Sequence, residues 1–78
     1  MWYVYLLNCG NTKPYVGCTD NLKDRLDRHK NGYVPATKNI RSVKLHCYFA
    51  IADRYKAFTF EKYLKSGSGR AFMKRHLL

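Results

Sequence analysis

Two phenols, a guanidinium and a carboxylate stand beside the predicted apolar core of this sequence. They are Tyr5, Tyr15, Arg25 and Glu61. A phenol can take a proton from water, a guanidinium can neutralise a pentacovalent phosphate, and a single carboxylate can hold a hydrated Mg²⁺ ion. Together these residue types match the hydrolysis of a phosphodiester, provided that the fold brings them to one place.

Arg25 and His29 flank the apolar face of a predicted helix. They follow Leu22 and Leu26, respectively, by three positions, and side chains with this spacing lie on the same side of a helix. We therefore expect both to lean toward the sheet. An arginine at a buried edge is costly unless it meets an anion. The alternative is that Arg25 only extends along the edge of the core to reach water.

Glu61 is the only glutamate of the chain, and it shares a helix face with Ala57 and Leu64. This inward placement favours a metal ligand or a buried partner. Two alternatives remain. One is a salt bridge to Arg25, and the other is an exposed pair with Lys65, four residues further along the helix.

The tyrosines alternate in strand register. If the first two predicted strands form a hairpin, Tyr5 and Tyr15 project from neighbouring strands toward the helix that carries Arg25. Tyrosines in strands are otherwise ordinary core or surface residues. A Cβ atom at Gly17 could obstruct the close approach of a backbone or a ligand.

The elements that must position these residues follow from hydrophobic periodicity and from turn and capping signals. Both faces of the first strand are apolar, which indicates a strand covered on both sides. The order ββαβαα predicts a single α+β domain over residues 1–78, with a small three-stranded antiparallel sheet flanked by helices. The expected elements are a strand at 2–8, a turn at 9–14, a strand at 15–18, a helix that Thr19 or Asp20 caps and that ends near 30, a basic loop at 33–43, a strand at 45–51, a helix at 54–65 that Asp53 caps, and a helix at 70–76 after a break at 66–69.

The charge of the chain is strongly unbalanced, with 15 Lys and Arg against 5 acids and a formal net charge of +10. This excess favours a nucleic acid as partner, because each neutralised phosphate releases a counterion. The alternatives are cations that only keep the domain soluble, or an anionic membrane surface, which would need a basic amphipathic helix. The candidate DNA-binding residues are Arg28, Lys30, Lys38, Arg41, Lys65 and Arg70.

Other functional classes are disfavoured. No apolar run approaches the roughly 20 residues of a membrane span, so we expect no membrane association and a cytoplasmic location. Three cysteines without a C-x-x-C pair predict neither a disulfide framework nor a structural zinc site.

Four stretches follow the order and spacing of a known nuclease family. Residues 3–5 (Tyr-Val-Tyr) and 15–17 (Tyr-Val-Gly) resemble the two triplets that name the GIY-YIG family. Residues 19–29 and 57–65 resemble the helices that carry the family's arginine and glutamate. The resemblance covers nearly the whole chain, and it points to the small single-domain bacterial members and to the N-terminal nuclease domain of the excinuclease C subunit.

The resemblance implies a DNA endonuclease with a central three-stranded antiparallel sheet. By resemblance Glu61 binds a single Mg²⁺ or Mn²⁺ ion whose remaining ligands are mostly water. Tyr5 is then the general base, Tyr15 binds or orients the water and the phosphate, and Arg25 stabilises the developing charge. His29 matches a position near the scissile phosphate. No small-molecule cofactor is expected.

The sequence departs from the family pattern at two positions. Tyr3 replaces the first glycine of the first triplet, which should not affect the chemistry. Cys18 stands where the excinuclease C subunit's nuclease domain has a lysine that contacts the site, and this leaves a thiol near the centre. We expect no appended DNA-reading domain, and hence weak sequence specificity and targeting by DNA structure or by a partner protein.

Two other functions stay open. One is a non-catalytic nucleic-acid-binding module that kept the fold and its basic face. The other is a small subunit of a repair complex whose tyrosines and phenylalanines form an interface. The oligomeric state is open in each case.

Overall fold

The computed structural model describes residues 1–10, 13–38 and 43–78. Its elements follow the predicted ββαβαα order and form the expected α+β fold. They are β1 Trp2–Asn8, β2 Tyr15–Thr19, α1 Leu22–Lys30, β3 Lys44–Ile51, α2 Arg54–Lys65 and α3 Gly67–His76. Within the described parts of the chain, no helix is long and apolar enough to cross a membrane.

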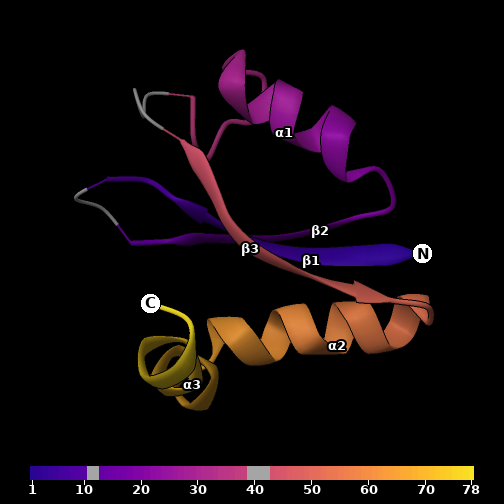
Figure 1. The fold of residues 1–78 in the computed structure, drawn as a ribbon, viewed down its shortest axis with the longest axis vertical. Helices are drawn as coiled ribbons and strands as arrows, with labels where there is room; N and C mark the ends of the chain where they lie inside the picture. The colour runs from indigo at the N-terminus through magenta and orange to yellow at the C-terminus, as the bar shows by residue number, and fades with distance from the viewer. Residues whose placement is uncertain (11–12, 39–42) are drawn as a thin grey trace.

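The sheet has three antiparallel strands in the order β2-β1-β3, so β1 is the central strand. Tyr5 pairs with Gly17 and Leu7 pairs with Tyr15 across β1 and β2. Residues 4–7 of β1 are fully buried, because helices cover both faces of the sheet. Figure 1 shows α1 on one side of the strands and α2 and α3 on the other. The prediction of a strand covered on both sides is confirmed.

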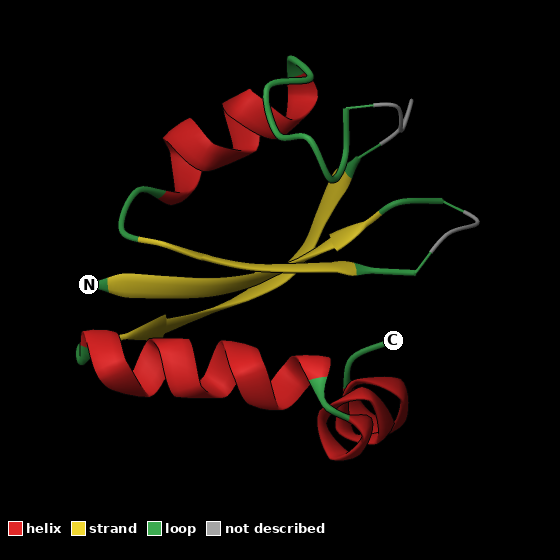
Figure 2. Cartoon of the chain, turned by 180° about the vertical axis from the view of Figure 1, so that it is seen from behind, coloured by secondary structure: helices red, strands yellow, loops and turns green. Residues whose placement is uncertain are grey.

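Each face of β1 belongs to a different core. Val4 and Leu6 point toward α2 and α3, where they form a cluster with Leu64 and Met73. Tyr5 and Leu7 point the other way and pack with Tyr15, Leu22 and Leu26. Figure 2 shows the same three layers from behind. The alternation of side chains along one strand thus separates a purely apolar core from a core that contains phenols.

The start of α1 differs from the prediction. Its cap is Asn21, not Thr19 or Asp20, and the Asn21 side chain accepts a hydrogen bond of 3.1 Å from the backbone N–H of Asp24. Thr19 is still the last residue of β2, and its hydroxyl oxygen accepts the N–H of Asn21 at 3.1 Å. The chain therefore needs two further residues to turn from the strand into the helix. The predicted cap of α2 is confirmed, since the Asp53 carboxylate accepts N–H groups of the first turn.

The start of α3 also differs, because the helix begins at Gly67 and not at Arg70. Ser66 caps it by accepting the N–H of Gly69 at 3.2 Å. A Cβ atom on Gly69 would stand 1.7 Å from the carbonyl oxygen of Tyr63, so this glycine lets α3 pack closely on the end of α2. The glycines that predicted a break are therefore part of a tight helical corner.

Candidate active site

Three rings that the sequence predicted to converge meet on the α1 face of the sheet. The ring centroids of Tyr5 and Tyr15 are 6.2 Å apart. The His29 ring lies 5.8 Å from that of Tyr5 and 4.8 Å from that of Tyr15, both in edge-on geometry. The hairpin register produces this arrangement, because Tyr5 and Tyr15 are diagonal neighbours on one face of paired strands.

A hydrogen-bonded chain of three buried side chains runs through this cluster. The Tyr5 hydroxyl lies 3.0 Å from Nε2 of His29, and Nδ1 of His29 lies 2.8 Å from Oγ1 of Thr37. The exposed fractions are 0% for Tyr5, 2% for His29 and 1% for Thr37. Sequence reasoning missed Thr37, which lies in the loop after α1. The sequence points to such a residue only indirectly, because a buried histidine needs a hydrogen-bond partner for each of its two ring nitrogens.

The surroundings of this chain keep its ionisable members neutral. Burial raises the pKa of Tyr5 to about 12, the charge of Tyr15 adds to this rise, and the Arg25 guanidinium opposes it by charge and hydrogen bonding. Burial lowers the pKa of His29, and Arg25 lowers it further. At neutral pH the cluster therefore contains a phenol and an uncharged imidazole.

Arg25 is half-buried on the sheet-facing side of α1, as its spacing predicted. The charge of Arg25 opposes the rise in the pKa of both Tyr5 and Cys18, so the guanidinium lies within electrostatic reach of both side chains. The alternative salt bridge between Arg25 and Glu61 is not formed. Among the residues that the structure describes, the only ion pair joins Glu61 and Lys65.

Glu61 projects from α2, on the side of the sheet opposite α1. Its side chain is 21% exposed, and one carboxylate oxygen lies 2.9 Å from Nζ of Lys65. The alternative that the sequence left open, a pair between Glu61 and Lys65 four residues apart on one helix, is thus formed. The negative charge of Glu61 nevertheless raises the pKa of both Tyr5 and Cys18, so the carboxylate lies within electrostatic reach of the phenol cluster around the β2 edge.

The donors around Glu61 suit a hydrated ion better than a fully coordinated one. In the described parts of the chain, no group of three or more His, Cys, Asp and Glu side chains could hold a metal ion. Mg²⁺ commonly keeps several waters and takes only one or two carboxylates from the protein. A single, partly exposed carboxylate fits this chemistry, whereas Zn²⁺ needs more side-chain ligands.

Cys18 of β2 packs against the core on the α2 side of the sheet. Burial raises its pKa and the charge of Glu61 raises it further, while Arg25 and Arg54 oppose the shift. The thiol is therefore neutral at physiological pH.

Arg54, which the sequence analysis did not select, stacks on aromatic rings with its guanidinium 5.2 Å from the centroid of Trp2.

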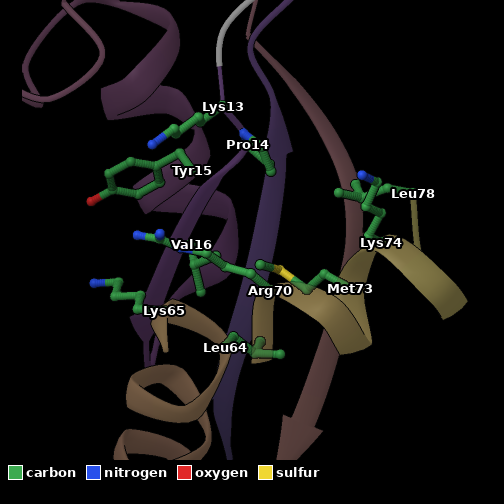
Figure 3. A pocket seen from close by; sticks show the side chains of 10 residues that line it. All are labelled: Lys13, Pro14, Tyr15, Val16, Leu64, Lys65, Arg70, Met73, Lys74 and Leu78. Carbon is green, nitrogen blue, oxygen red and sulfur yellow. The ribbon is translucent and has the colours of Figure 1, made fainter. Parts of the chain in front are cut away.

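A groove of about 740 Å³ opens beside Tyr15, between β2 and the corner of α2 and α3. Its floor includes Leu64 and Met73. Figure 3 shows Lys13, Tyr15 and Lys65 along one side and Lys74 on the other. Arg70 also lines the groove, and none of its described lining residues is acidic. The groove is therefore apolar inside and cationic at its rim.

The predicted DNA-binding residues divide into two groups. Lys65 and Arg70 lie together in this groove. Arg28, Lys30 and Lys38 are exposed on the α1 side of the molecule and do not line it. Arg41 lies outside the described residues.

Comparisons with known proteins agree with these motifs. The family model of the GIY-YIG catalytic domain matches residues 1–75. A UPF0213 protein of Clostridium perfringens is 35% identical over 66 residues, which cover 83% of this chain and 71% of that protein. A UPF0213 protein of Pediococcus acidilactici is 32% identical over 77 residues, which cover 94% of this chain and 78% of that protein. These names state no activity, and no solved structure matches the chain.

Proposed function

The chain belongs to the GIY-YIG family, which implies a nuclease-type function, and from this premise we propose that it is a divalent-metal-dependent DNA endonuclease with weak intrinsic sequence specificity. The observation that carries the proposal is the convergence of Tyr5, Tyr15 and His29 beside Arg25, with Glu61 in electrostatic reach. This cluster combines a proton acceptor, a cation for the phosphate and a metal ligand.

In the proposed reaction Tyr5 accepts the proton of the attacking water, and Tyr15, which is only half-buried, orients the water and the phosphate. Arg25 stabilises the negative charge that develops on phosphorus-bound oxygens. A guanidinium suits this role because its planar fork donates two parallel hydrogen bonds to a phosphate.

The burial of Tyr5 adds a requirement to this reaction. Tyr5 has no exposed surface, so water reaches its hydroxyl only when a covering side chain moves aside. Arg25 is suited to this movement, because a bound phosphate attracts the guanidinium that otherwise lies beside the phenol. Substrate binding would thus uncover the base and place the cation in one step.

Glu61 would hold the Mg²⁺ or Mn²⁺ ion, in exchange for its contact with Lys65. The ion, when bound, supplies a positive charge that polarises the phosphate and stabilises the leaving oxygen. We place Glu61 alone in this role, since a single carboxylate satisfies a largely hydrated ion.

The groove beside Tyr15 would carry the DNA backbone toward the cluster. Its cationic rim suits a polyanion, and its wall includes Tyr15. Contacts to phosphates carry no sequence information, which supports weak sequence specificity. We propose that a partner protein or an unusual DNA structure directs the enzyme in DNA repair or processing in the cytoplasm.

Plasmid nicking tests this proposal. The native protein, Glu61→Gln and Lys65→Gln are compared in Mg²⁺, in Mn²⁺ and in excess chelator. Both variants break the Glu61–Lys65 contact, which as an i,i+4 pair contributes only about 0.3–0.5 kcal/mol to stability. We expect Glu61→Gln to lose metal-dependent nicking while it still binds DNA, and Lys65→Gln to nick with weaker binding.

Two results would contradict the proposal. If Glu61→Gln nicks as fast as the native protein, Glu61 does not hold the metal. If the native protein binds DNA but nicks neither duplex nor single strands with either metal, the non-catalytic module is the correct account.

A further inference from the structure

Thr37 contacts the imidazole of His29 on the side opposite Tyr5. Within the described residues the His29 ring makes two hydrogen bonds, of 3.0 Å between Nε2 and the Tyr5 hydroxyl and of 2.8 Å between Nδ1 and Thr37 Oγ1. The Thr37 hydroxyl also lies 3.5 Å from the carbonyl oxygen of Val34. The loop after α1 is therefore joined to the central strand through one imidazole ring.

The direction of these hydrogen bonds follows from counting protons and acceptors. An uncharged imidazole carries one N–H, so one ring nitrogen donates and the other accepts. If Nδ1 donates to Thr37, the threonine proton can go to the Val34 carbonyl and the Tyr5 proton can go to Nε2. If Nε2 donates to Tyr5 instead, the phenol proton has no acceptor among the hydrogen bonds of the described residues. Only the arrangement in which Nδ1 donates to Thr37 provides an acceptor for every donor among these three buried side chains.

We propose that Thr37 is a positioning residue that holds His29 as the Nδ1–H tautomer, which makes Nε2 the acceptor of the Tyr5 proton. The tautomer is a property of the folded protein. Its use in the reaction rests on the proposed nuclease function.

The tautomer lets Tyr5 act as a proton relay. As the water oxygen bonds to phosphorus, a water proton moves to the Tyr5 oxygen. In the same step the original Tyr5 proton moves to Nε2 of His29, which becomes an imidazolium. The bond between phosphorus and the leaving oxygen then breaks, and that oxygen takes its proton from solvent. The His29 imidazolium then releases one proton to solvent, which restores the neutral ring. Charge and protons balance without any additional reactant.

A relay removes a difficulty of the buried phenol. The pKa of Tyr5 is raised to about 12, so hardly any phenolate exists at neutral pH. With Nε2 positioned as an acceptor, the phenol passes on its own proton while it receives another. Without Thr37, the competing Nε2–H tautomer would block this transfer, since it directs a proton at the Tyr5 oxygen.

Nitrogen NMR of ¹⁵N-histidine-labelled protein tests the tautomer without any substrate. Neutral imidazole nitrogens with and without a proton have well-separated shifts, so the spectrum reports which nitrogen is protonated. We expect His29 to be the Nδ1–H form in the native protein and in Thr37→Ser. We expect Thr37→Val, which keeps the shape but loses the hydroxyl, to shift His29 toward the Nε2–H form. If the native protein shows mainly Nε2–H or imidazolium at neutral pH, the proposal is wrong.

Single-turnover cleavage tests the relay. Thr37→Val should reduce the rate about 10²-fold, at the lower end of what positioned proton transfer contributes, with unchanged DNA affinity. Thr37→Ser should restore the rate. Thr59→Val is the matched control, because the Thr59 hydroxyl is exposed on α2 and donates to the Tyr55 carbonyl of its own helix.

The outcomes distinguish the two levels of the proposal. A native protein that never cleaves DNA but shows the Nδ1–H tautomer refutes the nuclease and leaves the positioning role standing. An altered tautomer with a normal cleavage rate in Thr37→Val refutes the relay. Should Thr37→Val fail to fold, the tautomer of the native protein and of Thr37→Ser still decides.

Discussion

The phenol of Tyr5 occupies the space that a side chain at Gly17 would need. A Cβ atom on Gly17 would stand 2.3 Å from the hydroxyl oxygen of Tyr5 and 2.4 Å from the ring carbon that carries it. The two residues are direct partners across β1 and β2. The last residue of the second family triplet therefore leaves room for the tyrosine of the first, and this lets the Tyr5 hydroxyl reach His29.

Gly17→Ala should displace Tyr5 and reduce stability. Adding a methyl group to a packed interior costs about 1–3 kcal/mol, and the Tyr5 ring must move for the variant to fold. We expect a lower urea midpoint, loss of the His29 tautomer preference and loss of cleavage. Gly67→Ala is the control, because a Cβ there meets nothing within 4 Å and should leave all three unchanged. Normal cleavage by Gly17→Ala would show that the position of Tyr5 is not essential.

Arg25→Lys should separate chemistry from charge. The substitution keeps the net charge but removes the planar fork, so we expect cleavage to slow by about 10²-fold or more, the effect of losing one transition-state donor. Arg28→Lys, on the exposed side of the same helix, should cleave normally. DNA affinity without metal should be similar for both. A normal rate for Arg25→Lys would assign Arg25 to the edge of the core.

Arg70 and Arg75 provide a matched pair for the groove. Both lie on α3, but only Arg70 lines the groove beside Tyr15, and Arg75 faces a different hollow. Binding of a short duplex should weaken linearly with the logarithm of salt concentration. Arg70→Gln should reduce the salt slope by about one unit, while Arg75→Gln should change it little. Equal effects of the two substitutions would place the DNA elsewhere.

His29 should make the fold sensitive to mild acid. Its pKa is lowered in the folded state by burial and by Arg25. Among the residues that the structure describes, Tyr5 and Tyr15 are the other ionisable side chains whose rings contact it. The unfolded chain therefore binds a proton near pH 6.5, before the folded protein does. The contribution of His29 to the free energy of unfolding should be fully present above this pH and should decline as the pH falls below it.

Urea midpoints between pH 5 and pH 8 measure this decline. His29→Gln should make the profile flatter, even though the variant is less stable overall. His76→Gln alters an exposed side chain on α3 and should keep the native slope. A native profile that is flat below pH 6.5 would contradict the lowered pKa.

Alternation and helical spacing were enough to predict how the rings converge. Tyr5 alternates with buried aliphatic residues in β1, and His29 follows Leu26 by one helical turn, so both had to face the space between α1 and the sheet. Thr37 could not be predicted, because a single threonine in a loop has no periodic neighbours that reveal its direction. The α3 start was wrong because glycine at a close helix contact resembles glycine at a helix break.

The groove was also beyond sequence analysis. It depends on how the α2–α3 corner sits against β2, which is a relation between three elements that no local pattern encodes. Glu61 lies between these cases. Glu61 is only partly buried, and the contact with Lys65 and the proposed metal are alternatives that spacing alone does not separate.

The central strand β1 carries Tyr5 on one face and residues of the core under α2 and α3 on the other. Tyr5 lies between Val4 and Leu6, whose side chains pack under α2 and α3 with Leu64. A chain of this size has a folding free energy on the order of 4–12 kcal/mol, and truncating a buried leucine to alanine removes about 2–5 kcal/mol of it. Leu64→Ala can therefore lower activity by lowering the folded fraction, although Leu64 packs in the core on the other side of the sheet from Tyr5. In an alanine scan scored by activity alone, Leu64 would be indistinguishable from Arg25.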